Sequence, residues 1–319
     1  MKLPLVPLVA AFAVAPLVHV RGADKFDPKT APFSIAFNGE TSAYRDMSTF
    51  VLPQTPLTIE VVGGPDGAYT LKSEQGAFVA HGVRAWRWTA PAQYGQYDVT
   101  ITPPHGKDDI TLHVFVMAPF TDVRNGYLNA YRIGNYPATP LKGNPLYLPP
   151  KGFVEVTKKN RDTKLTPHFK LKQFLCKEDL SDSYPKYVVI KERLLLKLEA
   201  ILEQVNRWGF KVDTLHVMSA YRTPYYNKAI GDVLYSQHQW GSAADIFIDP
   251  DEKGRMEDLN GDRTVDIRDS KYFYDRIEDL LALKEFHRFQ GGMGYYPATS
   301  AHPPFVHVDV RGTKARWKG

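Results

Sequence analysis

The amino-terminal third of the chain consists of short runs of alternating or β-branched residues with turn residues between them. About seven such runs lie between residues 31 and 119, separated by Gly, Pro, Asn and Asp. Examples are 33–37, 57–61, 97–101 and 110–116. Runs of this length with period-two alternation are typical of half-buried strands. The pattern predicts an all-β, immunoglobulin-like antiparallel sandwich over residues 31–119.

The carboxy-terminal half has a different pattern, which mixes helical and strand spacing and predicts an α+β domain over residues 165–319. Apolar residues recur at helical spacing over 194–208, and Gly209 follows where a helix would stop. A second helix is expected over 271–289, capped by Ser270 or Asp269. Strands are expected at 214–218, 291–296 and 305–311. Residues 120–164 are rich in Pro, Gly, Asn and Tyr without a sustained period, which indicates a linker or wrapping segment.

The first 22 residues have the pattern of a signal peptide: a short charged start, an apolar centre and small residues at a cleavable end. Three prolines in the apolar stretch argue against a stable membrane anchor, so we expect export to the periplasm or the cell exterior, with no membrane span in the mature chain. A lone cysteine, Cys176, excludes an internal disulfide and is expected to be a small buried apolar residue. The net charge of +5, without a concentrated basic run, predicts no nucleic-acid partner. We expect a monomer.

The segment from Ser236 to Asp249 carries the chemistry. His238 enters from a loop, and seven residues later Asp245 begins an apolar strand, where a bare carboxylate would be costly to bury without a metal or a partner. Imidazole and carboxylate are ligands of catalytic zinc, which takes three protein ligands and leaves one position for water. His307, on another apolar stretch, is the best candidate for the third ligand, and His302 is the reserve.

Three blocks of the sequence together resemble the signature blocks of the M15 metallopeptidases, a family that includes D-alanyl-D-alanine carboxypeptidases, D-Ala-D-Ala dipeptidases and murein endopeptidases. The first block is 219–224 with Asn227, and the last is 305–309. The middle block, Ser236-x-His238-x-x-Gly241-x-Ala243-x-Asp245, is the most specific. Residues 292–297 also look like the murein endopeptidase branch. The resemblance covers residues 165–312, about half of the chain.

The resemblance implies a Zn²⁺ ion on His238, Asp245 and His307, and hydrolysis of peptide bonds in bacterial peptidoglycan by zinc-activated water. It implies that Arg222 faces the substrate, where a guanidinium can pair with a carboxylate or steady a developing oxyanion. Ser236 would orient the metal loop. Whether the bond lies in a stem peptide or in a crosslink, and so whether the enzyme is a carboxypeptidase or an endopeptidase, stays open.

The general base departs from the family pattern. Some members carry a glutamate three residues before the last histidine ligand, where this chain has Pro304, and others carry His-x-His, where this chain has Phe305. Asp309 points to the same strand face as His307 and is the residue we predict as the base; its alternative role is to hydrogen-bond a ligand imidazole. Without a base, the domain would be a catalytically inactive zinc-containing module that binds cell wall.

A separate acidic stretch between the two halves of the metal motif resembles a calcium loop of the EF-hand or dockerin kind. Oxygen-bearing side chains stand at relative positions 1, 3, 5, 9 and 12, namely Asp258, Asn260, Asp262, Asp266 and Asp269, and Thr264 at position 7 can give a backbone carbonyl. Position 6 is Arg263, where such loops want glycine, and position 12 is Asp rather than Glu. The stretch predicts either a Ca²⁺ site or a solvated acidic turn that caps the following helix.

Overall fold

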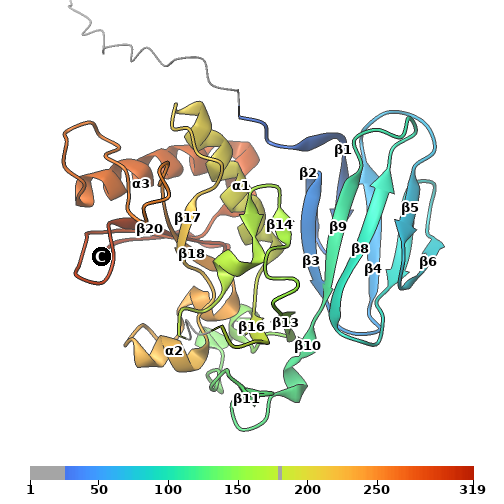
Figure 1. Ribbon diagram of the computed structural model, residues 1–319, viewed down its shortest axis with the longest axis horizontal. Helices are drawn as coiled ribbons and strands as arrows, with labels where there is room; N and C mark the ends of the chain where they lie inside the picture. Colours follow the sequence, from blue (N-terminus) through green and yellow to red (C-terminus); the bar gives the residue numbers. More distant parts are fainter. Residues whose placement is uncertain (1–25, 179–181) are drawn as a thin grey trace, which may run out of the picture.

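The computed structural model describes residues 26–178 and 182–319 (Figure 1). The predicted signal peptide at 1–22 lies outside the described residues. Within the described ranges, no helix combines the length and the apolar character that a membrane crossing requires.

Two sheets form the amino-terminal part and lie face to face in Figure 1. The first has the order β2 (Glu40–Tyr44), β1 (Thr30–Phe37), β4 (Pro56–Val62), β7 (Ala85–Thr89), β6 (Ala77–Ala80). The second has the order β3 (Asp46–Val51), β9 (Ile110–Val116), β8 (Gly95–Thr102), β5 (Thr70–Ser73). In β4 the alternate residues Leu57, Ile59 and Val61 are buried and the residues between them are exposed, as period-two patterning requires.

One strand pair differs from the prediction of a fully antiparallel sandwich, because β3 and β9 run parallel. Their parallel register is possible because β3 comes early and β9 late in the domain, and the strands between them supply the long crossover that parallel neighbours need. His113 on β9 joins three strands: its Nδ1 lies 2.8 Å from Asp98 Oδ1 on β8, and its Nε2 lies 3.4 Å from Asp46 Oδ1 on β3. Burial lowers the pKa of His113, but the two carboxylates outweigh burial and raise it to about 9.

The carboxy-terminal part is built on a second five-stranded sheet with two long helices against it (Figure 1). The strand order is β17 (His216–Ser219), β18 (Ala243–Phe247), β20 (Phe305–Asp309), β19 (Gly292–Tyr296), β21 (Ala315–Lys318), and only β19 and β21 pair in parallel. The helices are α1 (Glu192–Arg207), which the periodicity predicted, and α3 (Ile267–Ala282). The molecule is therefore sheet-rich and multidomain, as predicted.

The boundaries of α3 differ from the prediction at both ends. The helix begins at Ile267 because Asp266, and not the predicted Ser270 or Asp269, is the N-cap. Asp269 accepts a hydrogen bond from the amide of Asp266, which completes a capping box. It ends at Ala282, and 3₁₀ turns (Lys284–Phe289) follow. Cys176 is buried, as predicted.

The segment predicted as a linker or wrapping segment packs along the carboxy-terminal part. Its β-structure comprises β11 (Tyr127–Leu128), β12 (Tyr131–Arg132) and β13 (Gly152–Val156), and β13 lies between β10 (Ala118–Pro119) and β16 (Lys186–Val188). Tyr136 donates to the carbonyl of Gln239 at 2.9 Å, and Trp240 Nε1 donates to the carbonyl of Leu148 at 2.9 Å. Short strands β14 (Lys164–Thr166) and β15 (Phe169–Lys170) and the short helix α2 (Pro224–Ala229) complete the domain.

Helix α1 also contacts the amino-terminal sheets. Glu192 Oε1 accepts hydrogen bonds from Asn38 Nδ2 at 2.7 Å and from Thr49 Oγ1 at 2.8 Å. Further along the helix, Glu203 accepts from the hydroxyl of Tyr44 at 2.6 Å. The first and fourth turns of α1 are thus both tied to the sandwich.

We predict that His113→Gln lowers the free energy of unfolding by about 1 to 3 kcal/mol at pH 6. Because the pKa of His113 is raised in the folded state, its contribution is fully present below its unfolded pKa of about 6.5 and is lost as the pH rises through about 9. Urea unfolding at pH 6 and pH 9.5 should show a smaller difference between variant and parent at the higher pH. The exposed His81→Gln is the control, and an equal loss at both pH values would contradict the assignment.

Candidate metal centre

The pairing of β18 with β20 brings two of the predicted ligands together. Asp245 and His307 are direct partners in this antiparallel pair, so their side chains leave the sheet on the same face. The third, His238, lies on a 3₁₀ turn (Gln237–Trp240) that leads into β18. Gly241 ends this turn with φ +63°, and a Cβ there would lie 2.1 Å from the carbonyl oxygen of Val189. Only glycine permits this close return of the chain.

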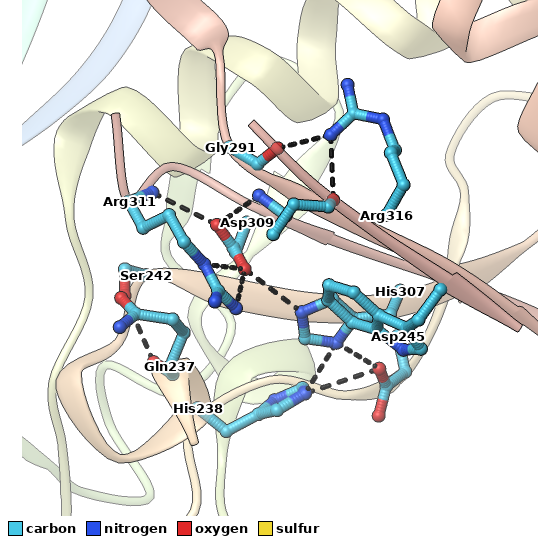
Figure 2. A network of polar contacts seen from close by, with 12 residues as sticks. Gln237, His238, Ser242, Asp245, Gly291, His307, Asp309, Arg311 and Arg316 are labelled. Carbon is cyan, nitrogen blue, oxygen red and sulfur yellow. Dashed lines mark hydrogen bonds and ion pairs between the residues drawn. The ribbon is translucent and has the colours of Figure 1, made fainter. Parts of the chain in front are cut away.

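The three side chains converge on one buried point (Figure 2). His307 Nδ1 lies 2.9 Å from Asp245 Oδ1, His238 Nε2 lies 3.2 Å from the same oxygen, and the two ring nitrogens are 3.1 Å apart. Among the described residues this is the only group of three or more His, Cys, Asp or Glu side chains close enough to share a metal ion.

The surroundings of the two imidazoles fit a divalent cation. His238 Nδ1 donates to the carbonyl of Ala220 at 2.6 Å, so its Nε2 lone pair faces the shared point. His307 Nε2 donates to Asp309 Oδ2 at 3.3 Å, which leaves Nδ1 facing the same point. A metal-binding histidine usually donates one ring N–H to an acceptor. This hydrogen bond fixes the ring orientation and leaves the other ring nitrogen free to bind the metal.

The charge states agree with this fit. Burial lowers the pKa of His238 and keeps that ring neutral. Burial also lowers the pKa of His307, but hydrogen bonds to Asp245 and Asp309 outweigh it and raise the pKa overall. Burial alone would raise the pKa of Asp245, whereas His238, His307 and Arg222 hold it well below its usual range. A bound cation would replace the proton that His307 otherwise shares with the ionised Asp245.

Arg222 is held between two carboxylates at the edge of the metal point, the position on which His238, Asp245 and His307 converge. Its Nη2 donates to Asp245 Oδ2, its Nη1 donates to Asp232 Oδ2 at 2.7 Å, and its Nε donates to Ser219 Oγ at 2.9 Å. The sequence motif includes Arg222 but not Asp232. This carboxylate lies just beyond α2, and no spacing rule connects it to the motif.

Asp309 lies behind His307, has no exposed surface and accepts several hydrogen bonds (Figure 2). Oδ1 accepts from the amides of Gly292 at 2.7 Å and Arg311 at 3.0 Å, and Oδ2 accepts from the Arg311 guanidinium as well as from His307. Burial would raise the pKa of Asp309, but His307 and Arg311 hold it far below its usual range. Lys197 on α1, whose pKa burial lowers to about 7, donates to the Asp309 carbonyl at 2.8 Å.

The comparisons with known proteins fit this geometry. The sequence model of the family Peptidase M15 matches residues 167–275, about a third of the chain. This part of the chain is similar to the M15 peptidases. A search of curated proteins found no match. The matched range contains His238 and Asp245, and His307 joins them through the strand register. M15 peptidases are typically zinc-dependent, and the buried His, Asp, His group of this chain has ligands that zinc accepts.

The point where His238, Asp245 and His307 converge opens into a cavity of about 470 Å³. Aromatic rings form much of its wall, contributed by Tyr235, Tyr296, Phe305 and Trp317. Trp317 Nε1 donates to the Tyr296 hydroxyl at 2.7 Å, and the Trp317 ring centroid lies 5.2 Å from that of His307. Trp317 comes from β21, a strand that no pattern in the sequence predicted.

Two further predicted residues have clear positions. Ser236 is buried in the cavity wall just before the turn that carries His238, and its orienting role stays a prediction. The reserve ligand His302 lies outside the metal cluster, with Nδ1 2.9 Å from the carbonyl of Pro303.

The predicted calcium stretch forms a compact loop whose carboxylates are occupied by its own amides and by an arginine. Asp258 accepts from the amides of Gly261 and Arg263, and the buried Asp269 accepts from that of Leu259. Arg268 pairs with Asp262 and Asp266. Arg263 has φ +69°, the conformation that glycine usually supplies at this position. The cap on α3 is present, and calcium binding stays a prediction.

We predict that Asp309→Asn weakens zinc binding about 10- to 100-fold without removing it, because the carboxylate that orients His307 is lost while all three ligands remain. Competition against a fluorescent chelator measures the affinity. The exposed His105→Ala should bind zinc like the parent. An unchanged affinity in a folded Asp309→Asn protein would show that Asp309 does not support the ligand.

Proposed function

We propose that the protein is a zinc-dependent peptidase that hydrolyses peptide bonds in the stem peptides or crosslinks of peptidoglycan after export to the cell wall. The observation that carries the proposal is the buried convergence of His238 Nε2, Asp245 Oδ1 and His307 Nδ1 beside a cavity. Zinc bound by three such ligands supplies Lewis acidity and an activated water. Soft thiolate ligands play no part in the group, which favours a borderline or hard divalent ion.

Arg222 suits the stabilisation of developing negative charge on the substrate. Three of its nitrogens already donate to Ser219, Asp232 and Asp245, which fix the orientation of the planar guanidinium. A guanidinium carries five N–H groups, so two remain for the cavity. Because two carboxylates already balance its charge, we assign it to a carbonyl that becomes an oxyanion rather than to a permanent substrate carboxylate.

For the general base, the geometry favours Asp232 over Asp309. Asp309 has no exposed surface and its lone pairs are occupied by amides, Arg311 and His307, so we assign it to the orientation of His307. Among the described residues, Asp232 and Asp245 are the two carboxylates in the cavity wall, and Asp245 is a ligand. The Asp232 side chain is 27% exposed, so a substrate-side water can reach it.

We further propose that the amino-terminal part is an immunoglobulin-like sandwich that positions the peptidase domain, and that the chain acts as a monomer. The hydrogen bonds of Glu192 and Glu203 to the sandwich support a fixed placement. The rival function is an inactive zinc-containing module that binds cell wall, which is favoured by Pro304 and Phe305 at the positions of the family's usual bases.

We predict that the mature protein, loaded with zinc, releases new peptide termini from purified peptidoglycan and its muropeptides, and that chelator and His238→Ala each abolish this release. Mass spectrometry of the products names the bond. Asp232→Asn should keep zinc and lower kcat at least about 100-fold, within the range for loss of a general base, while the exposed His105→Ala remains active. One equivalent of zinc without cleavage of any muropeptide would overturn the enzyme and favour the binding module.

A further inference from the structure

A second groove, of about 580 Å³, adjoins the metal cavity. It lies between the β11–β12 hairpin and α2, which Figure 1 shows at the same end of the domain. Asp232 lines both the groove and the cavity. Its neighbour Val233 lines the cavity, and the next residue, Leu234, lines the groove. The loop 232–234, which is exposed at Val233 and Leu234, is therefore the wall between them. A substrate that extends past this loop from the cavity enters the groove.

Arg132 of β12 is the most prominent charged group in this groove. Its guanidinium carbon lies 3.5 Å from the centroid of the Tyr225 ring and 5.9 Å from that of Tyr127. Stacking of the planar guanidinium on an aromatic face holds the group in place while its N–H edges stay available. Arg132 is exposed, and in the part of the chain that the structure describes it has no carboxylate partner.

The backbone fixes Arg132 relative to the metal site. The amide of Tyr225 donates to the carbonyl of the buried Ile133 at 3.1 Å, so the residue after Arg132 is bonded to the first turn of α2. Gly134 has φ +82°, and a Cβ there would lie 2.6 Å from the Tyr225 nitrogen. The hairpin thus packs directly on the helix that begins two residues after Arg222.

The charges of the groove favour an anion. Lys228 also lines it and, within the described ranges, is not paired with a carboxylate. The carboxylate of Asp232 is already bonded to Arg222. Arg222 itself is balanced by Asp232 and Asp245, so a negatively charged part of a substrate meets its available cation at Arg132.

We propose that Arg132 is a specificity-determining residue that binds a carboxylate of the peptide substrate in this groove, on one side of the bond that is cut at the metal point. The inference rests on the proposed peptidase function and adds to it that the substrate is an acidic peptide. Lys228 adds to the positive electrostatic potential of the groove, and Arg132 forms the direct contact with the carboxylate.

The test uses two matched synthetic stem peptides, one with free carboxylates and one with every carboxyl converted to carboxamide. For the parent protein with zinc, kcat/KM should be about tenfold higher for the acidic peptide, the size of one charge-assisted hydrogen bond. Arg132→Gln should remove this preference by lowering kcat/KM for the acidic peptide and leaving the amidated peptide unchanged. Arg132→Lys should keep part of it, because charge remains but the planar fork is lost.

Calorimetric titration of both peptides into chelator-treated protein gives a second measurement that needs no turnover. The same roughly tenfold preference should appear in Kd and disappear in Arg132→Gln. Arg87→Gln, an exposed arginine on β7 of the sandwich, is the matched control and should behave like the parent. If the parent cleaves neither peptide, the peptidase proposal fails, and the titration alone then tests whether Arg132 binds a peptide carboxylate in the groove. Equal effects of Arg132→Gln on both peptides, or none on either, would overturn the role of Arg132.

Discussion

The register between β18 and β20 is the constraint on which the rest of the site depends. It sets Asp245 opposite His307 and surrounds both with apolar strand residues. A shift of β18 by one residue would turn Asp245 to the other face of the sheet and set Ala244 or Ile246 opposite His307. Because β18 and β20 lie in the interior of the sheet, with neighbours on both sides, such a slip would disrupt every strand around them.

The buried charged side chains beside β18 and β20 form a continuous series of pairs. Asp309 holds His307, Arg311 holds Asp309, and Arg222 holds Asp245. Each ion is hydrogen-bonded as well as paired, which is the condition under which burial of charge is tolerable. Gly291 and Gly292 allow the chain to approach Asp309, since a Cβ at Gly291 would lie 1.9 Å from its carbonyl oxygen. The pair of glycines is therefore part of the ligand support.

What the sequence could predict depended on whether the signal was local. His238 and Asp245 stand seven residues apart around a glycine, and α1 has a clear period, so both were predictable. His307 could be proposed as the third ligand, but its pairing with Asp245 is a matter of strand register. Asp232, Lys197 and Trp317 act through contacts between distant segments, and no local pattern marks them. The parallel pairing of β3 and β9 escaped prediction for the same reason.

Helix α1 connects the amino-terminal sheets to the strand that carries His307. Glu192 in its first turn is bonded to the sandwich, and Lys197, a little over one turn later, is bonded to the strand that carries His307. The helix is thus bonded to the sandwich near both of its ends and to the strand of His307 near its middle. The strand that carries His307 is therefore joined to the amino-terminal sheets through one continuous helix, and not only through the connecting segment of the chain.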